Sequence, residues 1–270
     1  MAVHPTAVIA PGAVIGKNVE IGPYAVVENN CVIGDNCYID AHAKVCEFTT
    51  VGEGTRIYYG ALVGTEPQDH RFKPGIRSFT EIGKNAVIRE YVTIHRSPFE
   101  DQKTCVGDGT LLMAFVHIGH DAKIGNYVTI ANQTAVAGHV IIEDRAVLSA
   151  YVLIHQFCRI GSLAMIGGRT ILPQDVPPYC MLAENCKVCG PNVIGMRRAG
   201  MEADDRLAIR KAIKTYFFKD LNGSNALAEI ESEPVTPEVA HFVEFIRGSE
   251  RGIMAGASDL AGFMFDEEQC

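Results

Sequence analysis

Aliphatic residues recur at every sixth position over the first two thirds of the chain. One run of Ile, Val and Leu extends from Ile9 to Val63, a short run from Ile82 to Ile94, and a third from Val106 to Leu172. A small or apolar residue often stands two positions earlier, and Gly often follows directly. This period predicts short strands with inward aliphatic side chains, joined by tight corners at which Gly eases the backbone.

Three hexads close one triangular coil of about 18 residues, so every third aliphatic residue falls in the same column. Successive coils then stack at about 4.8 Å, the spacing of paired strands. The pattern therefore predicts a parallel β-helix with a core of axially stacked aliphatic side chains. We expect it to occupy residues 1–190.

Two segments interrupt the period and predict loops extruded from the prism. The first, residues 65–80, contains Pro67 and Pro74. The second, residues 95–105, has Glu100 where an aliphatic residue is due. Loops on a rigid scaffold often carry functional residues, although a tolerated surface insertion would also explain each one.

The hydrophobic period changes to helical spacing in residues 191–270. The residues with this spacing are Ile209, Ala212, Ile213, Tyr216 and Phe217, and then Val239, Phe242, Val243 and Ile246. Thr236 and Pro237 suit an N-cap and a first helical turn. We expect a small α-helical C-terminal domain that ends in a loose tail from Gly256.

Composition and charge exclude several classes of function. The chain has 270 residues and a formal net charge of −8, without the basic excess that nucleic-acid binding needs. No apolar run approaches the roughly 18 residues of a membrane span, and residues 1–20 lack the pattern of a secretory signal. We expect a cytoplasmic protein with no nucleic-acid partner and no integral membrane segment.

The cysteines indicate buried side chains rather than a metal site. Cys31, Cys37 and Cys158 fall at inward positions of the repeat, which suits small apolar side chains in a reducing compartment. Cys186 and Cys189 form a lone CxxC pair, which without a second pair supports zinc only weakly. We therefore predict no metal site.

Histidines gather on one edge of the predicted prism. A period of 18 residues stacks His120, Gly138 and Gln156 on consecutive coils, each about 5 Å from the next. Three further histidines flank this column: His117, His139 and His155. A column of polar residues on an outward edge does little to stabilise a prism, so it indicates a functional site.

The residues of this column suit proton transfer. Asp121 follows His120, and a carboxylate beside an imidazole can hold its tautomer and stabilise the imidazolium. This favours a general base acting on a hydroxyl. The backbone N–H of Gly138, one coil further, could face a developing oxyanion. No Ser or Cys shares the register, so we predict direct acyl transfer from a thioester to a hydroxyl.

Motifs along the chain also resemble a known family. They are residues 116–121 (VHIGHD), 137–140 (AGHV), 154–158 (IHQFC), 174–179 (QDVPPY) and 195–200 (GMRRAG). Single hexads are unspecific, but these motifs in this order resemble the hexapeptide-repeat acyltransferases that act on UDP-N-acetylglucosamine. The resemblance runs from about residue 3 to Ile253. It implies an all-β left-handed parallel β-helix, whereas the general crossover rule would give a right-handed one.

The resemblance implies roles for individual residues. His120 would be the general base on the sugar 3-hydroxyl, Asp121 its partner, and the Gly138 N–H the oxyanion donor. The residues implied in substrate binding are Asp69, Arg71, His117, His139, His155, Gln156, Gly168, Asn192 and Arg198. Arg71 stands where the family usually has Lys, and Cys186 where it often has His.

The resemblance also implies the reaction partners. A 3-hydroxyacyl group would pass from the thioester of acyl carrier protein to UDP-N-acetylglucosamine, the start of lipid A synthesis, with no cofactor. Such enzymes are homotrimers with active sites between subunits. Because the carrier protein and this chain are both acidic, docking needs a local basic patch. Our candidates for it are Arg89, Arg96, Arg159 and Arg169.

The preferred acyl length is expected to depend on Gly168. We place this residue just beyond the His column on the same edge, where a larger side chain would cap the acyl groove. The prediction is a long 3-hydroxyacyl donor. A Gly that merely eases a corner is the competing interpretation.

Other functions remain open from the sequence. One is the related N-acyltransferase of sugar nucleotides, which carries an additional N-terminal domain. Another is a zinc-dependent β-helical hydratase that would recruit His117, His120 and His139. A scaffold without enzymatic activity is the third. The choice between N-acetylglucosamine and its 3-amino analogue also stays open, because an imidazole base would serve both.

Overall fold

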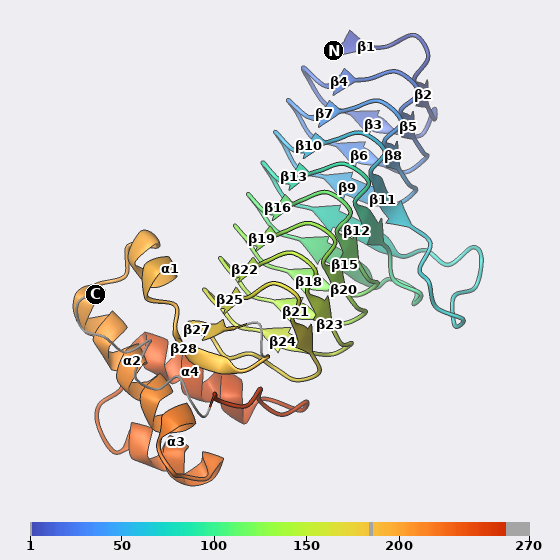
Figure 1. Ribbon diagram of the computed structural model, residues 1–270. Coiled ribbons are helices and arrows are strands. Elements are labelled where there is room, and N and C mark those ends of the chain that lie inside the picture. Colours follow the sequence, from blue (N-terminus) through green and yellow to red (C-terminus); the bar gives the residue numbers. More distant parts are fainter. Residues whose placement is uncertain (1, 184–185, 258–270) are drawn as a thin grey trace.

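Most of the chain forms a prism of stacked coils (Figure 1). The computed structural model describes residues 2–183 and 186–257. Its strands are two to four residues long and belong to three sheets, here called A, B and C, one on each side of the prism. Every pairing is parallel except the last pair of sheet A.

The strands of the three sheets alternate along the chain. Sheet A contains β1 (Ala2–Val3), β4 (Glu20–Ile21), β7 (Tyr38–Ile39), β10 (Arg56–Ile57), β13 (Val87–Ile88), β16 (Leu111–Leu112), β19 (Thr129–Ile130), β22 (Val147–Leu148), β25 (Met165–Ile166), β27 (Cys180–Leu182) and β28 (Val188–Pro191). Sheet B contains β2 (Val8–Ile9), β5 (Val26–Val27), β8 (Lys44–Val45), β11 (Leu62–Thr65), β14 (Thr93–His95), β17 (His117–Ile118), β20 (Ala135–Val136), β23 (Leu153–Ile154) and β26 (Ile171–Leu172). Sheet C contains β3 (Val14–Ile15), β6 (Val32–Ile33), β9 (Thr49–Val51), β12 (Phe79–Ile82), β15 (Lys103–Val106), β18 (Lys123–Ile124), β21 (Ile141–Ile142) and β24 (Arg159–Ile160).

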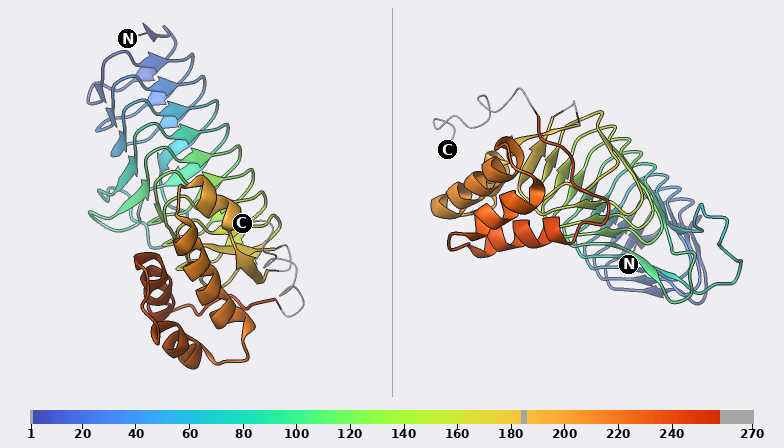
Figure 2. Two further views of the ribbon diagram at one scale, coloured as in Figure 1. Left: turned by 90° about the vertical axis from the view of Figure 1, so that its left-hand side faces the viewer. Right: turned by 90° about the horizontal axis from the view of Figure 1, so that it is seen from below.

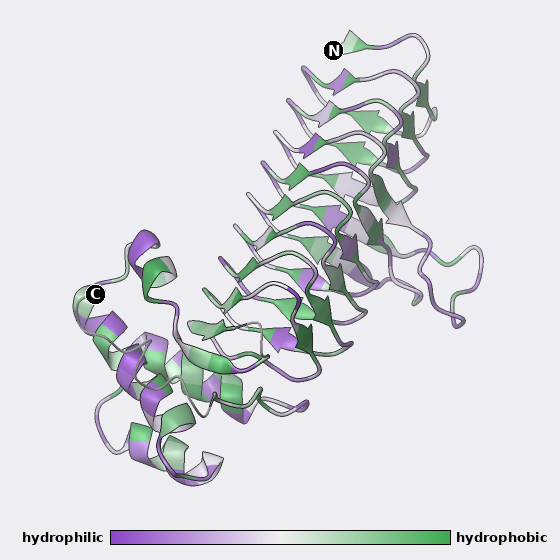
Figure 3. Cartoon of the chain, in the orientation of Figure 1, coloured by the Kyte–Doolittle hydropathy of each residue, from purple (hydrophilic) through white to green (hydrophobic). Residues whose placement is uncertain are grey.

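The predicted aliphatic columns form the core. Ile118 pairs with Val136, which pairs with Ile154, so residues 18 apart stack on one another. The aliphatic positions from Ile21 to Leu172 are buried, and the short strands are mostly hydrophobic in colour (Figure 3). Ile9 and Ile15 are only partly buried because they lie in the terminal coil, which is covered on one side only.

The corners differ from the prediction in one respect. The Gly that follows an aliphatic position serves close packing of coils: a Cβ on Gly107 would lie 2.5 Å from the carbonyl carbon of Gly125. Positive φ falls two residues later instead, as at Asp121 (φ 59°) and His139 (φ 61°). The first position of the corner therefore needs Gly for space, and the left-handed backbone falls at a later position of the same corner.

The two loops are shorter than predicted. Only residues 66–78 and 96–102 lie outside strands, because β12 and β15 pair over four residues. Thr80 and Thr104 are thus buried strand residues. The six-residue period identifies only the last residue of each of these strands, Ile82 and Val106. The predicted loops, residues 65–80 and 95–105, therefore included residues that belong to strands.

Up to residue 257, where the described part of the chain ends, four helices follow the prism and gather at the end opposite the N-terminus (Figures 1 and 2). They are α1 (Val193–Arg198), α2 (Ala203–Phe218), α3 (Gly223–Glu231) and α4 (Pro237–Arg247). The expected N-cap is present, because the Thr236 side chain accepts a hydrogen bond from Val239 N. The helical spacing indicated α2 and α4, whereas α1 and α3 were missed.

After α4 the chain returns to the prism. Ile253 bridges to Asp175 and Gly256 bridges to Val188. The expectation of a loose tail from Gly256 was therefore wrong for residues 256 and 257. The remaining tail, residues 258–270, lies outside the described residues.

Candidate active site

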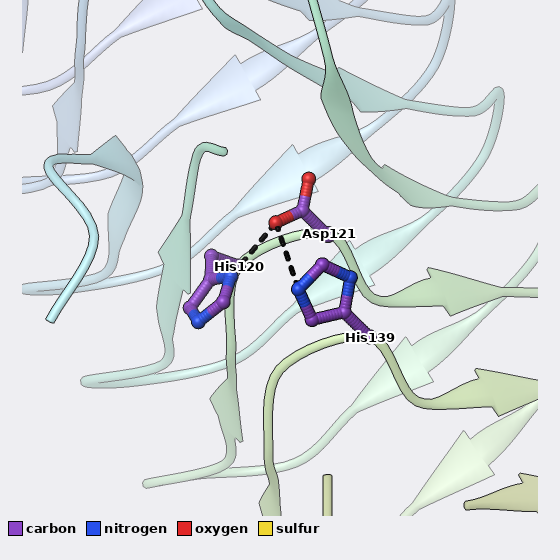
Figure 4. A group of neighbouring side chains, drawn as sticks. All are labelled: His120, Asp121 and His139. Carbon is purple, nitrogen blue, oxygen red and sulfur yellow. Dashed lines mark hydrogen bonds and ion pairs between the residues drawn. The ribbon is translucent and has the colours of Figure 1, made fainter. Parts of the chain in front are cut away.

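The histidine column lies on the edge between sheets B and C, here called the BC edge. His120 follows β17 and Gly138 follows β20, in the corners that lead to sheet C. Figure 4 shows Asp121 between His120 and His139. The register predicted from the period brings these residues together.

His120 and Asp121 form a short hydrogen bond. The distance from His120 Nδ1 to Asp121 Oδ2 is 2.7 Å, and both side chains are mostly buried. Asp121 N in turn donates to Thr104 Oγ1 at 2.7 Å, which fixes the backbone of this corner to sheet C. Because a carboxylate accepts this hydrogen bond, the proton of neutral His120 lies on Nδ1 and Nε2 is left as the proton acceptor.

Electrostatics keep the Asp121 carboxylate ionised. Burial alone would raise its pKa, but hydrogen bonds from His120 and Ser97 and the nearby His139 lower the pKa of Asp121 below its usual value. His139 Nε2 lies 3.6 Å from the same Oδ2 atom. An ionised partner can hold the imidazole and stabilise its protonated form during a reaction.

A second carboxylate faces the other side of His120. Asp69, in the loop of residues 66–78, places Oδ2 3.4 Å from His120 Nε2. The Arg71 guanidinium donates hydrogen bonds of 2.7–3.1 Å to both carboxylate oxygens of Asp69. These bonds hold the pKa of Asp69 well below its usual range. The Arg71 guanidinium also covers the ring of Phe99 at 4.9 Å, so the two loops meet over the BC edge.

Two neighbouring histidines, one buried and one half-buried, have lowered pKa values that favour the neutral ring. Burial lowers the pKa of His117 to about 4, with His95 and His120 adding to the effect. Burial likewise lowers the pKa of His95. The rings of His95 and His117 lie 5.0 Å apart, and His117 Nδ1 is 2.8 Å from Thr93 Oγ1. No role was predicted for His95 from the sequence, although the pairing of β14 with β17 places it beside His117.

Gly138 packs directly against the ring of His120. A Cβ on Gly138 would lie 2.7 Å from both Cε1 and Nε2 of His120. In several corners between sheets C and A, the backbone N–H at the same position of the hexad donates to a side chain of the next coil, as when Lys17 N donates to Asp35. The residue one coil beyond Gly138 is Gln156, and among the described residues the Gly138 N–H donates no hydrogen bond. This N–H is therefore open to a ligand oxygen.

His139, His155 and Gln156 extend the site along the same edge. The His139 ring stacks on Phe157 at 4.7 Å, with an angle of 8° between the planes. His155 and Gln156 are exposed in the next coil and border an open hollow with Leu153 and Ile171. The structure thus brings His117, His120, Asp121, Gly138, His139, His155, Gln156, Asp69 and Arg71 to one edge.

Three residues predicted for this site lie away from the BC edge in the structure. Gly168 is in the corner between β25 and β26, on the edge between sheets A and B. The expectation that it shares the edge of the His column was wrong, because Gly168 follows a strand of sheet A and His120 a strand of sheet B. Asn192 caps α1 and donates to Leu163 O, in the corner between sheets C and A. Arg198, at the end of α1, is exposed.

The predicted basic patch does not form as a group. Arg96 is only 7% exposed and donates to Ile76 O. Arg159 donates to the carbonyls of Phe245 and Gly248 at the end of α4. Arg89 forms an ion pair with Glu90, which leaves Arg169 as the one exposed candidate without an ion pair among the described residues. Two of the four predicted docking arginines, Arg96 and Arg159, are therefore held by backbone carbonyls of this chain.

One cluster within residues 2–183 and 186–257 could hold a metal ion: His120, Asp121 and His139. It differs from the trio proposed for a hydratase, because His117 directs Nδ1 to Thr93. Cys189 is buried and its thiol lies against Met181 O, away from the BC edge. None of the described helices is long and apolar enough to cross a membrane.

Family models match both parts of the chain. The model for bacterial transferase hexapeptide (six repeats) matches residues 30–65 and 106–138. The model described as Udp N-acetylglucosamine O-acyltransferase, domain 2, matches residues 175–254. The coils and the site on their edge define a hexapeptide-repeat transferase.

Full-length relatives specify the family. The chain is 51% identical over 263 residues to the acyl-[acyl-carrier-protein]–UDP-N-acetylglucosamine O-acyltransferase of Chlamydia muridarum, covering 95% of this chain and 94% of that protein. It is 41% identical over 269 residues to the enzyme of the same name from Chlamydia abortus, covering 98% and 95%. This chain belongs to the acyl-[acyl-carrier-protein]–UDP-N-acetylglucosamine O-acyltransferase family.

Solved structures agree with this assignment. The UDP-N-acetylglucosamine acyltransferase of Bacteroides fragilis superposes with a TM-score of 0.90 at 44% identity, covering 93% of this chain and 99% of that one. The corresponding enzyme of Arabidopsis has a TM-score of 0.83 at 35% identity, covering 93% and 99%. The comparisons favour the O-acyltransferase over the N-acyltransferase, hydratase and scaffold alternatives.

Proposed function

We propose that this protein transfers a 3-hydroxyacyl group from acyl carrier protein to the 3-hydroxyl of UDP-N-acetylglucosamine, the first step of lipid A synthesis. The observation that carries the proposal is the position of His120. Its Nδ1 is held by the ionised Asp121, and Gly138 packs against the ring at Nε2 and Cε1. A base and an oxyanion donor side by side are what acyl transfer to an alcohol requires.

The proposed reaction balances within this site. His120 Nε2 takes the proton of the sugar hydroxyl while the hydroxyl oxygen attacks the thioester carbonyl. The negative charge moves to the carbonyl oxygen, which the Gly138 N–H stabilises. As the C–S bond breaks, the imidazolium returns the proton to the leaving thiol, and Asp121 stabilises the charged imidazole between these steps. No cofactor is needed in this scheme.

Sugar binding must displace one contact seen in the free chain. Asp69 Oδ2 lies 3.4 Å from His120 Nε2, where the reacting hydroxyl would approach. We propose that Asp69 turns to the glucosamine and keeps its bond to Arg71. His117, His139, His155 and Gln156 would line the sugar and phosphates.

A second copy of the chain would complete the site. Gly168 and Asn192 lie at other edges of the prism than His120, and Arg198 lies at the end of α1. A homotrimer can bring the BC edge of one subunit against a different edge of the next. We therefore propose trimeric assembly with sites between subunits, an acyl groove that reaches Gly168, and a left-handed coil as the family resemblance implies. The free cysteines of the described ranges are consistent with a cytoplasmic location.

The decisive experiment is incubation with UDP-N-acetylglucosamine and 3-hydroxyacyl carrier proteins of several lengths, with the products read by mass. We expect one acyl group per sugar, released by mild alkali because it is an ester. The 3-amino analogue is tested in parallel. A stable amide formed only with this analogue, or stoichiometric zinc with no acyl product, would contradict the proposal.

A further inference from the structure

Arg251 reaches the active-site edge from the segment that follows α4. Its Nη2 lies 3.1 Å from His155 Nδ1 and 3.0 Å from Pro173 O. Arg251 and His155 are 96 residues apart in the chain. Neither the repeat nor the motifs of the sequence indicated this contact, since Arg251 lies outside the β-helix.

The segment that carries Arg251 is firmly attached to the prism. Asp175, which is fully buried, accepts hydrogen bonds from Ser249 Oγ at 2.8 Å and from Arg159 N at 2.8 Å. The backbone of Asp175 also bonds to Gly252 O and Met254 N, on either side of Ile253. The anchoring begins and ends within three residues of Arg251. The backbone of Arg251 is therefore held on both sides, and its guanidinium is held by Pro173 O. This makes the Arg251 guanidinium a fixed donor rather than a freely moving side chain.

The donor decides which nitrogen of His155 carries the proton. A guanidinium has no acceptor, so Nδ1 of His155 must offer a lone pair to Arg251 and the proton of the neutral ring must lie on Nε2. A competing arrangement is available, because Nδ1 also lies 3.2 Å from Gln156 O. A carbonyl can only accept, so that contact would require the proton on Nδ1. Arg251 selects between the two tautomers.

We propose that Arg251 is a positioning residue that fixes the Nε2–H tautomer of His155. The ring then presents an N–H donor to an oxygen of the substrate instead of a lone pair, which an ionised phosphate oxygen would repel. The consequence for substrate binding rests on the proposed function. The tautomer itself can be measured in the free enzyme and does not depend on that function.

The first test is the tautomer. Selective ¹⁵N labelling of histidine in the intact protein distinguishes protonated from unprotonated ring nitrogens, at about pH 8, where an ordinary histidine is neutral. His155→Gln identifies the signals. We expect Nδ1 to be unprotonated in the wild type and protonated in Arg251→Met, where Gln156 O becomes its partner. A wild-type Nδ1 that carries the proton overturns the inference.

The second test is kinetic. If His155 donates to bound substrate, Arg251→Met should raise KM for UDP-N-acetylglucosamine about tenfold with kcat nearly unchanged, because the lost bond acts on the ground state and the transition state alike. Arg247→Met is the matched control: it removes the same charge from the end of α4, where Arg247 pairs with Glu231. We expect its KM to stay at the wild-type value.

A double-mutant cycle separates action through His155 from a general effect on the fold. In a His155→Phe background, Arg251→Met should raise KM no further. A full additional increase would show that Arg251 acts by another route and would overturn the inference. A tautomer switch with unchanged KM would support the positioning role and refute the contact between His155 and substrate in the proposed function. If Arg251→Met does not fold, Arg251→Lys replaces it, because Lys keeps the positive charge and should keep the wild-type tautomer of His155. A proton on Nδ1 of His155 in Arg251→Lys would overturn the inference.

Discussion

Adding one methyl group to Gly138 should disable the enzyme while sparing the fold. The Cβ of Gly138→Ala would lie 2.7 Å from Cε1 and Nε2 of His120, well inside van der Waals contact. On its other side the ring is held by the 2.7 Å hydrogen bond to Asp121, which Thr104 fixes to sheet C. The backbone of Gly138 does not have positive φ, so alanine itself is tolerated at this position.

The ring has to tilt by about 1 Å to restore ordinary contact. A misplacement of this size can reduce turnover about 10²-fold, because the base no longer meets the reacting hydroxyl in line. The cost to the free energy of unfolding is smaller. If the bond between His120 and Asp121 weakens, about 1 kcal/mol is lost, since one hydrogen bond contributes on the order of that amount.

Initial rates of ester formation, followed by mass, measure kcat for Gly138→Ala, and denaturant unfolding measures its stability. Gly223→Ala is the control, because its new Cβ in α3 would meet only Tyr216, at 3.3 Å or beyond. We expect the control to retain wild-type turnover. If Gly138→Ala is folded and its kcat stays within about threefold of the wild type, the ring position of His120 is not part of catalysis.

Three further predictions concern the base, the acyl groove and a partly buried ion pair. His120→Ala should lower kcat by about 10²–10⁴ with little change in substrate binding; near-normal turnover would remove His120 from the mechanism. Gly168→Met should shift the donor profile towards chains several carbons shorter in a folded trimer, and an unchanged profile would leave Gly168 as a corner residue. His241 lies 2.8 Å from Glu143, whose hydrogen bond raises the pKa of His241. The stabilisation is therefore complete below the unfolded pKa, about 6.5, and is lost as pH rises through the folded value. Thermal melting should show that Glu143→Gln destabilises the protein more at about pH 6 than at about pH 8.5; an equal loss at both would exclude this titration.

The hexad arithmetic was sufficient for most of the site. It placed His120 and Gly138 on one edge because strands pair at fixed intervals of 18 residues. The same arithmetic excludes Gly168 from that edge, since its distance from His120 is not a multiple of the coil length. The spacing along the chain was therefore sufficient to place Gly168 on another edge.

The loops and the return segment could not be placed in this way. Asp69 and Arg71 lie in an insertion, where no repeat fixes the register, and their approach to His120 depends on contacts such as that of Arg71 with Phe99. Arg159 had the charge expected of a docking residue, but its partners at the end of α4 occupy it. Charge is visible in the sequence, whereas the availability of a charge is not.

The sequence by itself determined the coil, its core and the column of His120, because periodic backbone pairing turns spacing along the chain into position in space. Only the tertiary structure decided what surrounds that column. Asp69 faces Nε2 of His120, and Arg251 faces Nδ1 of His155, through contacts between segments that share no period. Such contacts depend on how irregular segments pack against the prism, and that packing is a property of the whole fold rather than of local spacing.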